Sequence, residues 1–252
     1  MYCLISNCTH KALHVKWKRF SMANLFRHAN LNEIITKNRF ELASWASGRV
    51  VCGIDEVGRG CLAGPLVTAA VILPPNKLSP LLKDSKTLTA PQRLKAFAWI
   101  ERHCWYGVGV VSNHLIDKHN IRGATFLAMK RALAHALAAC PHSPELILID
   151  AMPLELSDTS SKGIPVYYFP DAERKSSSIA AASIVAKVRR DAIMGKLAAA
   201  FPGYSFQEHK GYGTRTHQEA LQHQKRSLIH RLTFLSKFIS KPSEHEDQQT
   251  LC

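Results

Sequence analysis

Short apolar runs alternate with segments of helical periodicity through the middle of the chain. The first three runs, at residues 49–55, 66–73 and 105–112, have the length and the β-branched content of strands. Residues 90–103 have apolar positions spaced three and four apart and predict a helix before the third run. Because consecutive strands usually pair as neighbours, the three runs are expected to form a meander.

Helices and strands alternate in the second half of the pattern. An amphipathic helix is expected over residues 123–139, and the longest helix over 176–201, whose many small residues would let it lie close to a sheet. Two more apolar runs, 145–150 and 164–169, predict the fourth and fifth strands. This order indicates an α/β fold with a mixed five-stranded sheet flanked by helices and with a C-terminal helical part.

The two ends of the chain lack this regular pattern. Residues 1–48 are basic and irregular, so we expect a partly disordered extension with one short helix near residues 38–47. Ahead of Met22 two interpretations stay open, a false upstream start or a targeting peptide. The regular part predicts one domain over residues 49–240, followed by a disordered polar tail at residues 241–252.

Charge narrows the class of partner. The chain has 252 residues and 46% hydrophobic content, enough for a sizeable core, and its 33 Lys and Arg against 19 Asp and Glu give a net charge of +14. A surplus of this size favours a polyanionic partner, either nucleic acid or an anionic membrane surface, and charge alone does not choose between them. No run approaches the roughly 20 apolar residues of a membrane span, so a soluble chain is expected, and the partners we expect include no membrane.

Cysteine usage narrows the compartment. The seven cysteines are an odd number without a CxxC pair, which argues against a disulfide framework and against a zinc site. The 13 histidines form no HExxH pattern either. We therefore expect a protein of a reducing compartment, the cytoplasm.

Acidic residues gather where the predicted strands end. Asp55 and Glu56 follow the first strand, Asp150 ends the fourth, and Asp171 and Glu173 come just after the fifth. Each alone is explained as readily by a turn or a helix cap. Together they would repel one another unless divalent cations lay among them, and hard carboxylate oxygens suit Mg²⁺ or Mn²⁺.

The adjacent pair of acids raises a geometric difficulty. Successive side chains of a strand point to opposite faces, so Asp55 and Glu56 would not share one site within a regular strand. We expect the strand to end here, because Gly58 and Gly60 allow the backbone to turn sharply. The turn would bring Glu56 back toward the site.

A carboxylate cluster beside basic surface points to metal-assisted hydrolysis of phosphodiesters, in which two cations activate water and stabilise the leaving oxygen. Between residues 171 and 241 the chain carries 13 Lys and Arg against five acids. A solvated helix face explains part of this surplus, and a surface that follows phosphates explains its single sign.

Five sequence blocks, in order, resemble bacterial ribonuclease HII over roughly residues 49–232. The blocks are GIDEVGRG, KDSKTL, LILID, SIAAASIVAKVRRD and FPGYSFQEHKGYGT. The resemblance implies the ribonuclease H-like fold, a catalytic domain over residues 49–240, and a metal-dependent endonuclease. Its expected substrates are the RNA strand of RNA–DNA hybrids and single ribonucleotides in duplex DNA, which it would cut on their 5′ side.

The same resemblance implies roles for individual residues. Asp55, Glu56 and Asp150 would bind Mn²⁺ or Mg²⁺. The glycine turn, defined as Gly58, Arg59 and Gly60, would bring its backbone to the ribose 2′-hydroxyl, and Tyr212 would recognise the DNA–RNA junction. The positions expected to contact phosphates are Lys86, Ser183, Lys187 and Lys210.

The chain departs from the family pattern at its fourth acid. The family carries its acid six residues before the isoleucine of IAAAS, and counting back from Ile179 reaches Glu173, with Asp171 two residues earlier. We favour Glu173 as the fourth carboxylate.

The resemblance also implies a monomer. The alternative function is a nucleic-acid-binding protein that keeps the fold without catalysis, although clustered acids facing phosphates would hinder such a protein.

Overall fold

The computed structural model describes residues 37–150, 152–156, 159 and 161–236. The expected disorder of the first residues, the choice of start at Met22 and the polar tail 241–252 lie outside the described residues. The predicted N-terminal helix is present as α2 (Arg39–Ala46). This helix precedes the expected domain boundary at residue 49, yet it packs on the domain. Phe40 stacks on Phe169 with ring centroids 5.4 Å apart.

A mixed five-stranded sheet forms the centre of the fold, in the order β3-β2-β1-β4-β5. Its strands are β1 (Val51–Val57), β2 (Leu66–Ile72), β3 (Trp105–Val111), β4 (Leu146–Asp150) and β5 (Val166–Phe169). The first three pair antiparallel as the expected meander, and β1, β4 and β5 run parallel. The carboxyl ends of β1, β4 and β5 therefore meet at one edge of the sheet.

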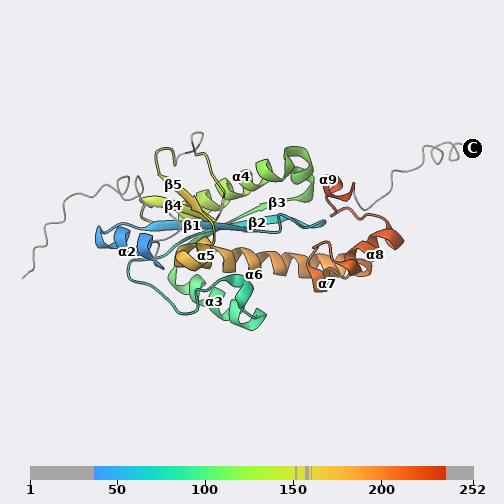
Figure 1. Cartoon of the computed structure of the whole chain (residues 1–252), viewed down its shortest axis with the longest axis horizontal. Coiled ribbons are helices and arrows are strands. Elements are labelled where there is room, and N and C mark those ends of the chain that lie inside the picture. The colour runs from blue at the N-terminus through green and yellow to red at the C-terminus, as the bar shows by residue number, and fades with distance from the viewer. Residues whose placement is uncertain (1–36, 151, 157–158, 160, 237–252) are drawn as a thin grey trace, which may run out of the picture. The chain divides into compact units, whose positions relative to one another are not determined.

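Helices cover both faces of the sheet (Figure 1). On one face lies α4 (Asn113–Ala139), and on the other lie α3 (Ala90–His103), α5 (Ala172–Lys175) and α6 (Ser177–Ala200). Each face has its own apolar core, with Ile54 and Met129 on the α4 side and Val71 and Val185 on the α6 side. The expected α/β architecture is confirmed.

Small residues set how close the helices come to the sheet. A Cβ atom on Gly109 of β3 would lie 2.0 Å from the carbonyl oxygen of Ala128 in α4, and one on Gly53 of β1 would lie 2.3 Å from the carbonyl carbon of Ser178 in α6. The backbones are thus nearly in contact at these points. Gly53 precedes Asp55 by two residues in β1. The close contact between Gly53 and α6 therefore fixes the position of Asp55 relative to α6.

The short helix η1 (Ser85–Thr87) lies between β2 and α3. The C-terminal helical part consists of η2 (Pro202–Tyr204), α7 (Phe206–His209), α8 (Arg215–Gln224) and α9 (Leu232–Leu235). Phe206, Leu221 and Leu235 pack with Leu62, which directly follows the strand β1 and its glycine turn. This part therefore lies beside the end of β1. No helix among the described residues has the length and apolar character that a membrane crossing requires.

The helix predicted over residues 123–139 is present as the second of two helical segments that make up α4. The first segment, which was not predicted, begins at Asn113, because the Ser112 hydroxyl caps its first turn by accepting from the Leu115 N–H at 3.4 Å. The backbone of α4 breaks at Asn120, where φ is 57° and ψ is 170°. The Asn120 side chain accepts from the Gly123 N–H at 3.1 Å and so restarts the helix.

The contact between β3 and α4 yields a stability prediction. Gly109→Ala should lower the free energy of unfolding by about 1–3 kcal/mol, since the new methyl group has no space. The matched control is Gly195→Ala in α6, where a Cβ would meet nothing within 4 Å, and which should stabilise by roughly 0.5–1 kcal/mol. Urea unfolding of both variants checks this; equal effects would contradict the close packing.

Candidate active site

A cavity of about 470 Å³ opens at the sheet edge where β1, β4 and β5 end. It gathers residues from β1, the glycine turn, η1, α3, β4, α5, α6 and the segment after α7. The predicted site residues that line it are Asp55, Glu56, Gly58, Arg59, Gly60, Lys86, Asp150, Glu173, Ser183, Lys187 and Tyr212. Lys210 is not among the lining residues, and neither is Asp171.

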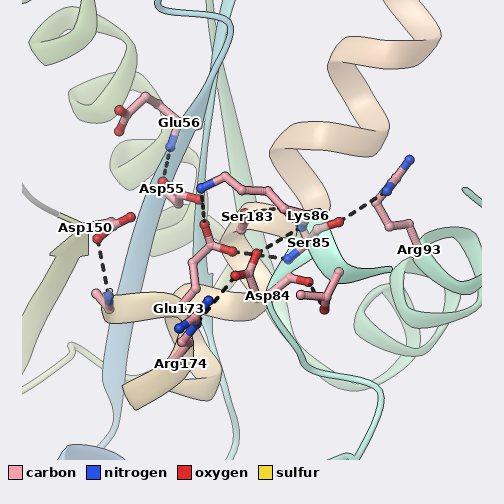
Figure 2. A network of polar contacts seen from close by, with 12 residues as sticks. Asp55, Glu56, Asp84, Ser85, Lys86, Arg93, Asp150, Glu173, Arg174 and Ser183 are labelled. Carbon is pink, nitrogen blue, oxygen red and sulfur yellow. Dashed lines mark hydrogen bonds and ion pairs between the residues drawn. The ribbon is translucent and has the colours of Figure 1, made fainter. Parts of the chain in front are cut away.

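The two adjacent acids belong to a regular strand, contrary to the expected strand end. β1 continues to Val57, and Figure 2 shows Asp55 and Glu56 leaving it in different directions. The expected return of Glu56 through a turn is therefore wrong. Both acids nevertheless line the cavity, because it extends around the end of the strand. The Glu56 N–H donates to Asp55 Oδ1 at 2.8 Å, which fixes the Asp55 carboxylate.

Asp55 is the most strongly perturbed carboxylate of the site. Its side chain is 5% exposed, and burial raises its pKa well above the ordinary value. The neighbouring charges of Glu56 and Glu173 raise this pKa further, against the lowering effect of hydrogen bonds from the Ser183 hydroxyl and the Glu56 N–H. The ionised form is therefore costly in the absence of a cation.

Glu173 enters the same region from α5. The Ser85 N–H donates to its Oε2 at 3.1 Å, and Lys86 Nζ lies 3.4 Å from its Oε1 (Figure 2). Burial raises the Glu173 pKa, and the Lys86 charge partly offsets this. Asp171 instead takes the left-handed backbone conformation ahead of α5, with φ of 54°. Of the two possible fourth acids, Glu173 is the one at the cavity.

Asp150 reaches the cavity from the last position of β4. Its Oδ1 accepts from the Ala172 N–H at 3.3 Å, which ties this strand end to the first turn of α5 (Figure 2). Its negative charge is one of the influences that raise the pKa of Glu56, after burial. Glu56 and Asp150 thus lie close enough to repel one another.

Glu56 and Arg59 carry unused polar atoms. Arg59 Nη1 lies 3.4 Å from Glu56 Oε1, while Glu56 Oε2 and Arg59 Nε are buried without a hydrogen-bond partner. Buried polar atoms without partners cost about 1–3 kcal/mol each. These two atoms are buried beside the cavity, and a cation and an anionic or hydroxyl group of a ligand would satisfy them.

The two glycines of the turn are glycine for different reasons. Gly58 has φ of +91°, and a Cβ there would lie 2.2 Å from Arg190 Nε. Its lack of a side chain is required by the protein's own packing. A Cβ on Gly60 would meet nothing within 4 Å, so internal packing does not explain this glycine, and the space above it is open to a ligand.

Tyr212 faces the glycine turn from the segment after α7. Its side chain is half-buried, and its residue pairs with Cys61 in an isolated β-bridge. His217 Nδ1 hydrogen-bonds the Tyr212 carbonyl oxygen at 2.9 Å, and the guanidinium of Arg190 lies 5.7 Å from the ring centroid. The ring is thereby held at the cavity while one part of it stays accessible.

Three lining residues were not singled out from the sequence, Val57, Ser85 and Arg93. Ser85 lies within the KDSKTL block, where its neighbour Lys86 was chosen instead, and its hydroxyl is 2.8 Å from that of Ser183. Arg93 lies in α3 and donates to the carbonyl oxygens of Ser85 and Leu88. The sequence offered a signal for Ser85, its place in the block, but none for Arg93 beyond its position in a helix.

Comparison with known proteins decides the family. The family model for Ribonuclease HII matches residues 52–237. Ribonuclease HII of Lactobacillus delbrueckii subsp. bulgaricus is 43% identical over 203 residues, which are 80% of this chain and 75% of that protein. The chain belongs to the ribonuclease HII family. The enzymes of this family are metal-dependent endoribonucleases that act on RNA–DNA hybrids, so this chain is an enzyme and not a binding protein without catalysis.

Solved structures agree with this ribonuclease HII assignment. The RNase HII in the PCNA:RNase HII complex from Archaeoglobus fulgidus aligns with a TM-score of 0.61 at 25% identity, covering 76% of this chain and 97% of that one. Bst-RNase HIII in complex with Mn²⁺ aligns with a TM-score of 0.51 at 25% identity, covering 71% of each chain. The expected ribonuclease H-like fold is confirmed.

The donor set fits a divalent cation of the kind that ribonucleases HII require. The cavity offers hard carboxylate oxygens, one of them the unpartnered Glu56 Oε2, and two of its acids are buried at 5% exposure. Among the described residues no three His, Cys, Asp or Glu side chains are already placed to hold one metal ion. Mg²⁺ is often held by one or two carboxylates together with substrate oxygens and water.

The perturbed carboxylate predicts a pH-dependent effect on stability. Because the pKa of Asp55 is raised above 3.8 in the fold, ionising it costs stability as pH rises above that value. In EDTA, Asp55→Asn should therefore raise the melting temperature at pH 7, by about 2–4 °C per kcal/mol relieved, and should give no gain near pH 3.5.

Thermal unfolding at several pH values measures this effect. Asp171→Asn is the matched control and should change little at any pH, since Asp171 lies outside the cavity. Added Mn²⁺ should stabilise the wild type more than Asp55→Asn. A melting temperature that is the same for the Asp55 variant and the wild type at pH 7 would contradict the charge repulsion.

Proposed function

We propose that this ribonuclease HII also incises duplex DNA on the 5′ side of a single embedded ribonucleotide. The observation that carries the proposal is one cavity that combines four carboxylates with an open glycine turn and a half-exposed tyrosine. The acids suit phosphodiester hydrolysis. The turn and the ring suit recognition of one sugar and of the base pair step beside it.

Asp55, Glu56, Asp150 and Glu173 are the proposed catalytic carboxylates, and the first three are the proposed metal ligands. Mn²⁺ or Mg²⁺ is the proposed cofactor, supported by the oxygen donor set and by the Mn²⁺ complex of the related Bst-RNase HIII. When bound, such cations supply an activated water and stabilise negative charge on the leaving oxygen. The protein's part is to place the acids at the cavity, where a cation would favour their ionised forms.

The glycine turn is the proposed reader of the ribose 2′-hydroxyl. The open space above Gly60 allows close approach of a sugar, and Gly58 gives the backbone its positive φ. A 2′-hydroxyl is both donor and acceptor, and it is the group that distinguishes RNA from DNA at one position. The unpartnered Arg59 Nε is a further donor within reach of the cavity.

Phosphate contacts are proposed for Lys86, Ser183, Lys187 and Lys210. Lys86 and Lys187 line the cavity but are paired with acids, at 3.4 Å from Glu173 and 2.8 Å from Asp191. A phosphate would compete for these ammonium groups. Lys210 does not line the cavity. The support for its role is its place in the sequence, two residues before Tyr212.

We propose further that the enzyme acts as a monomer in the cytoplasm. The four proposed carboxylates line one cavity within a single chain, so the proposed site is complete without a second copy. The four described cysteines, Cys52, Cys61, Cys104 and Cys140, are free thiols, as is usual in a reducing compartment.

Incubation with labelled duplexes tests the proposed function. One duplex carries a single ribonucleotide, one is all DNA, and one is a long RNA–DNA hybrid, each with Mg²⁺, with Mn²⁺ and with EDTA. We expect one nick, immediately 5′ to the ribonucleotide, that EDTA abolishes. Cleavage of the hybrid without any nick at the single ribonucleotide would refute the proposal while leaving the family activity intact.

Tyr212 should matter more for one substrate than for the other. Tyr212→Ala should reduce cleavage at a lone ribonucleotide about tenfold more than cleavage of a long hybrid, because a hybrid offers many binding registers. Tyr212→Phe is the matched control and should keep most of the preference, since it keeps the ring. Equal losses on both substrates would assign Tyr212 to folding or general binding.

The fourth carboxylate can be decided by a pair of substitutions. Glu173→Gln should reduce turnover by at least 10²-fold and raise the metal concentration needed for half-maximal activity, because it removes a charge from the cavity. Asp171→Asn should remain within about threefold of the wild type, as Asn tolerates the left-handed backbone. Metal titrations of both variants decide the matter, and the reverse pattern would contradict the assignment.

A further inference from the structure

Two arginines lie fully buried beneath the glycine turn. Arg190 in α6 and Arg231 just before α9 are both 0% exposed. Neither takes part in a salt bridge among the described residues. Their N–H groups donate hydrogen bonds to backbone carbonyl oxygens instead. Burying a guanidinium group is costly unless its donors are satisfied, so a fold that keeps two of them here needs a reason.

Arg190 lies against both elements that are proposed to recognise the substrate, the glycine turn and the segment from Lys210 to Tyr212. Its Nε donates to the Pro65 carbonyl at 2.9 Å and its Nη2 to that of Ala63 at 3.3 Å, both in the segment that follows the turn. Its Nη1 donates to the Lys210 carbonyl at 2.8 Å. The same guanidinium lies under the Tyr212 ring, with its carbon 5.7 Å from the centroid.

Gly58 lies directly over this arginine. A Cβ on Gly58 would lie 2.2 Å from Arg190 Nε, so the turn rests on the guanidinium group itself. One planar group thus bridges the turn on one side and the Lys210 to Tyr212 segment on the other. These two pieces are about 150 residues apart in the sequence.

Arg231 secures the other end of the turn. Its Nη1 donates to the Arg59 carbonyl at 2.9 Å, and its Nε and Nη2 both donate to the Gly64 carbonyl, at 3.1 and 2.9 Å. Burial lowers its pKa to about 10, which still leaves it charged at neutral pH. Arg231 thus ties Arg59 to Gly64, which limits the motion of the turn at this end. The position of its other end depends on the contact with Arg190.

We propose that Arg190 is a positioning residue that holds the glycine turn and Tyr212 at a fixed separation, and thereby sets the preference of the enzyme for a lone ribonucleotide over a long hybrid. The inference rests on the proposed function of these two elements. A lone ribonucleotide must satisfy the turn and the ring in one register. A long hybrid offers a 2′-hydroxyl in every register, so a loosened separation harms it less.

Arg190→Lys tests the geometry while keeping the charge. One ammonium group does not reach three carbonyl groups and the face of a ring at once. We expect the ratio of kcat/KM on a single-ribonucleotide duplex to that on a long hybrid to fall about tenfold. This ratio does not depend on the fraction of molecules that fold. Arg190→Met is the second variant and should lower the ratio at least as far.

The matched control is the neighbouring Arg189→Lys. Arg189 is exposed, pairs with Glu101 at 3.1 Å and lies over the Phe97 ring, away from the turn. Its substitution should leave the ratio within twofold of the wild type. Thermal unfolding of each variant separates any general loss of stability from the loss of preference.

A double substitution asks whether Arg190 acts through Tyr212. If it does, Arg190→Lys should change the ratio by less than twofold when Tyr212→Ala is already present, because coupled residues are not additive. A ratio within twofold of the wild type in both Arg190 single variants would overturn the proposal. A wild type that does not nick single ribonucleotides at all would instead refute the proposed function.

Discussion

The burial of several carboxylates around one cavity is the constraint on which this structure depends, and repulsion among them adds to it. Asp55, Glu56 and Glu173 all have raised pKa values, and burial is the first cause for each. Only Glu56 and Glu173 have a basic partner, and each of those contacts is long, at 3.4 Å. The free site is therefore electrostatically unfavourable, and cations at the proposed metal ligands would relieve it. Part of the affinity for metal would then arise from this relief.

The rigid seating of α6 on β1 maintains that state. Because α6 packs on β1, a helix free to move away would leave Asp55 less buried, and its pKa would fall toward the ordinary value. Gly53 prevents this, since it brings the backbones of β1 and α6 into contact two residues before Asp55. From that contact onward Ser183, Lys187 and Arg190 follow at helical spacing on one face of α6. This face connects the carboxylates to the glycine turn.

Most of the fold could be predicted from the sequence, and so could the acids of the site. Five apolar runs gave the strands, and the parallel ends of three strands explain why acids distant in sequence meet. Two local features were missed for identifiable reasons. The early start of α4 depends on the Ser112 cap, a single hydroxyl, and its break depends on Asn120, whose left-handed backbone has no periodic signal.

The position of Glu56 was predicted correctly with the wrong reason. A strand that ends at Asp55 was expected because two adjacent acids would otherwise face opposite sides. In the structure the strand continues, and the cavity extends around its end instead. The sequence shows which side chains alternate along a strand, but the extent of a cavity depends on elements packed from elsewhere, here η1 and α5.

The adjacent arginines of α6 show how far helical spacing alone reaches. Arg189 and Arg190 are neighbours in a basic stretch, yet one is exposed and the other is fully buried. Spacing places Arg190 on the face of Ser183 and Met194, both of which are buried, so its burial follows from a period of 3.6. What it contacts does not follow, because the Lys210 and Pro65 carbonyls arrive from remote segments. In the sequence, Gly58 is the residue that reflects this contact. The glycine was expected to allow close approach of the substrate, but it is required first by the packing of Arg190 against the turn.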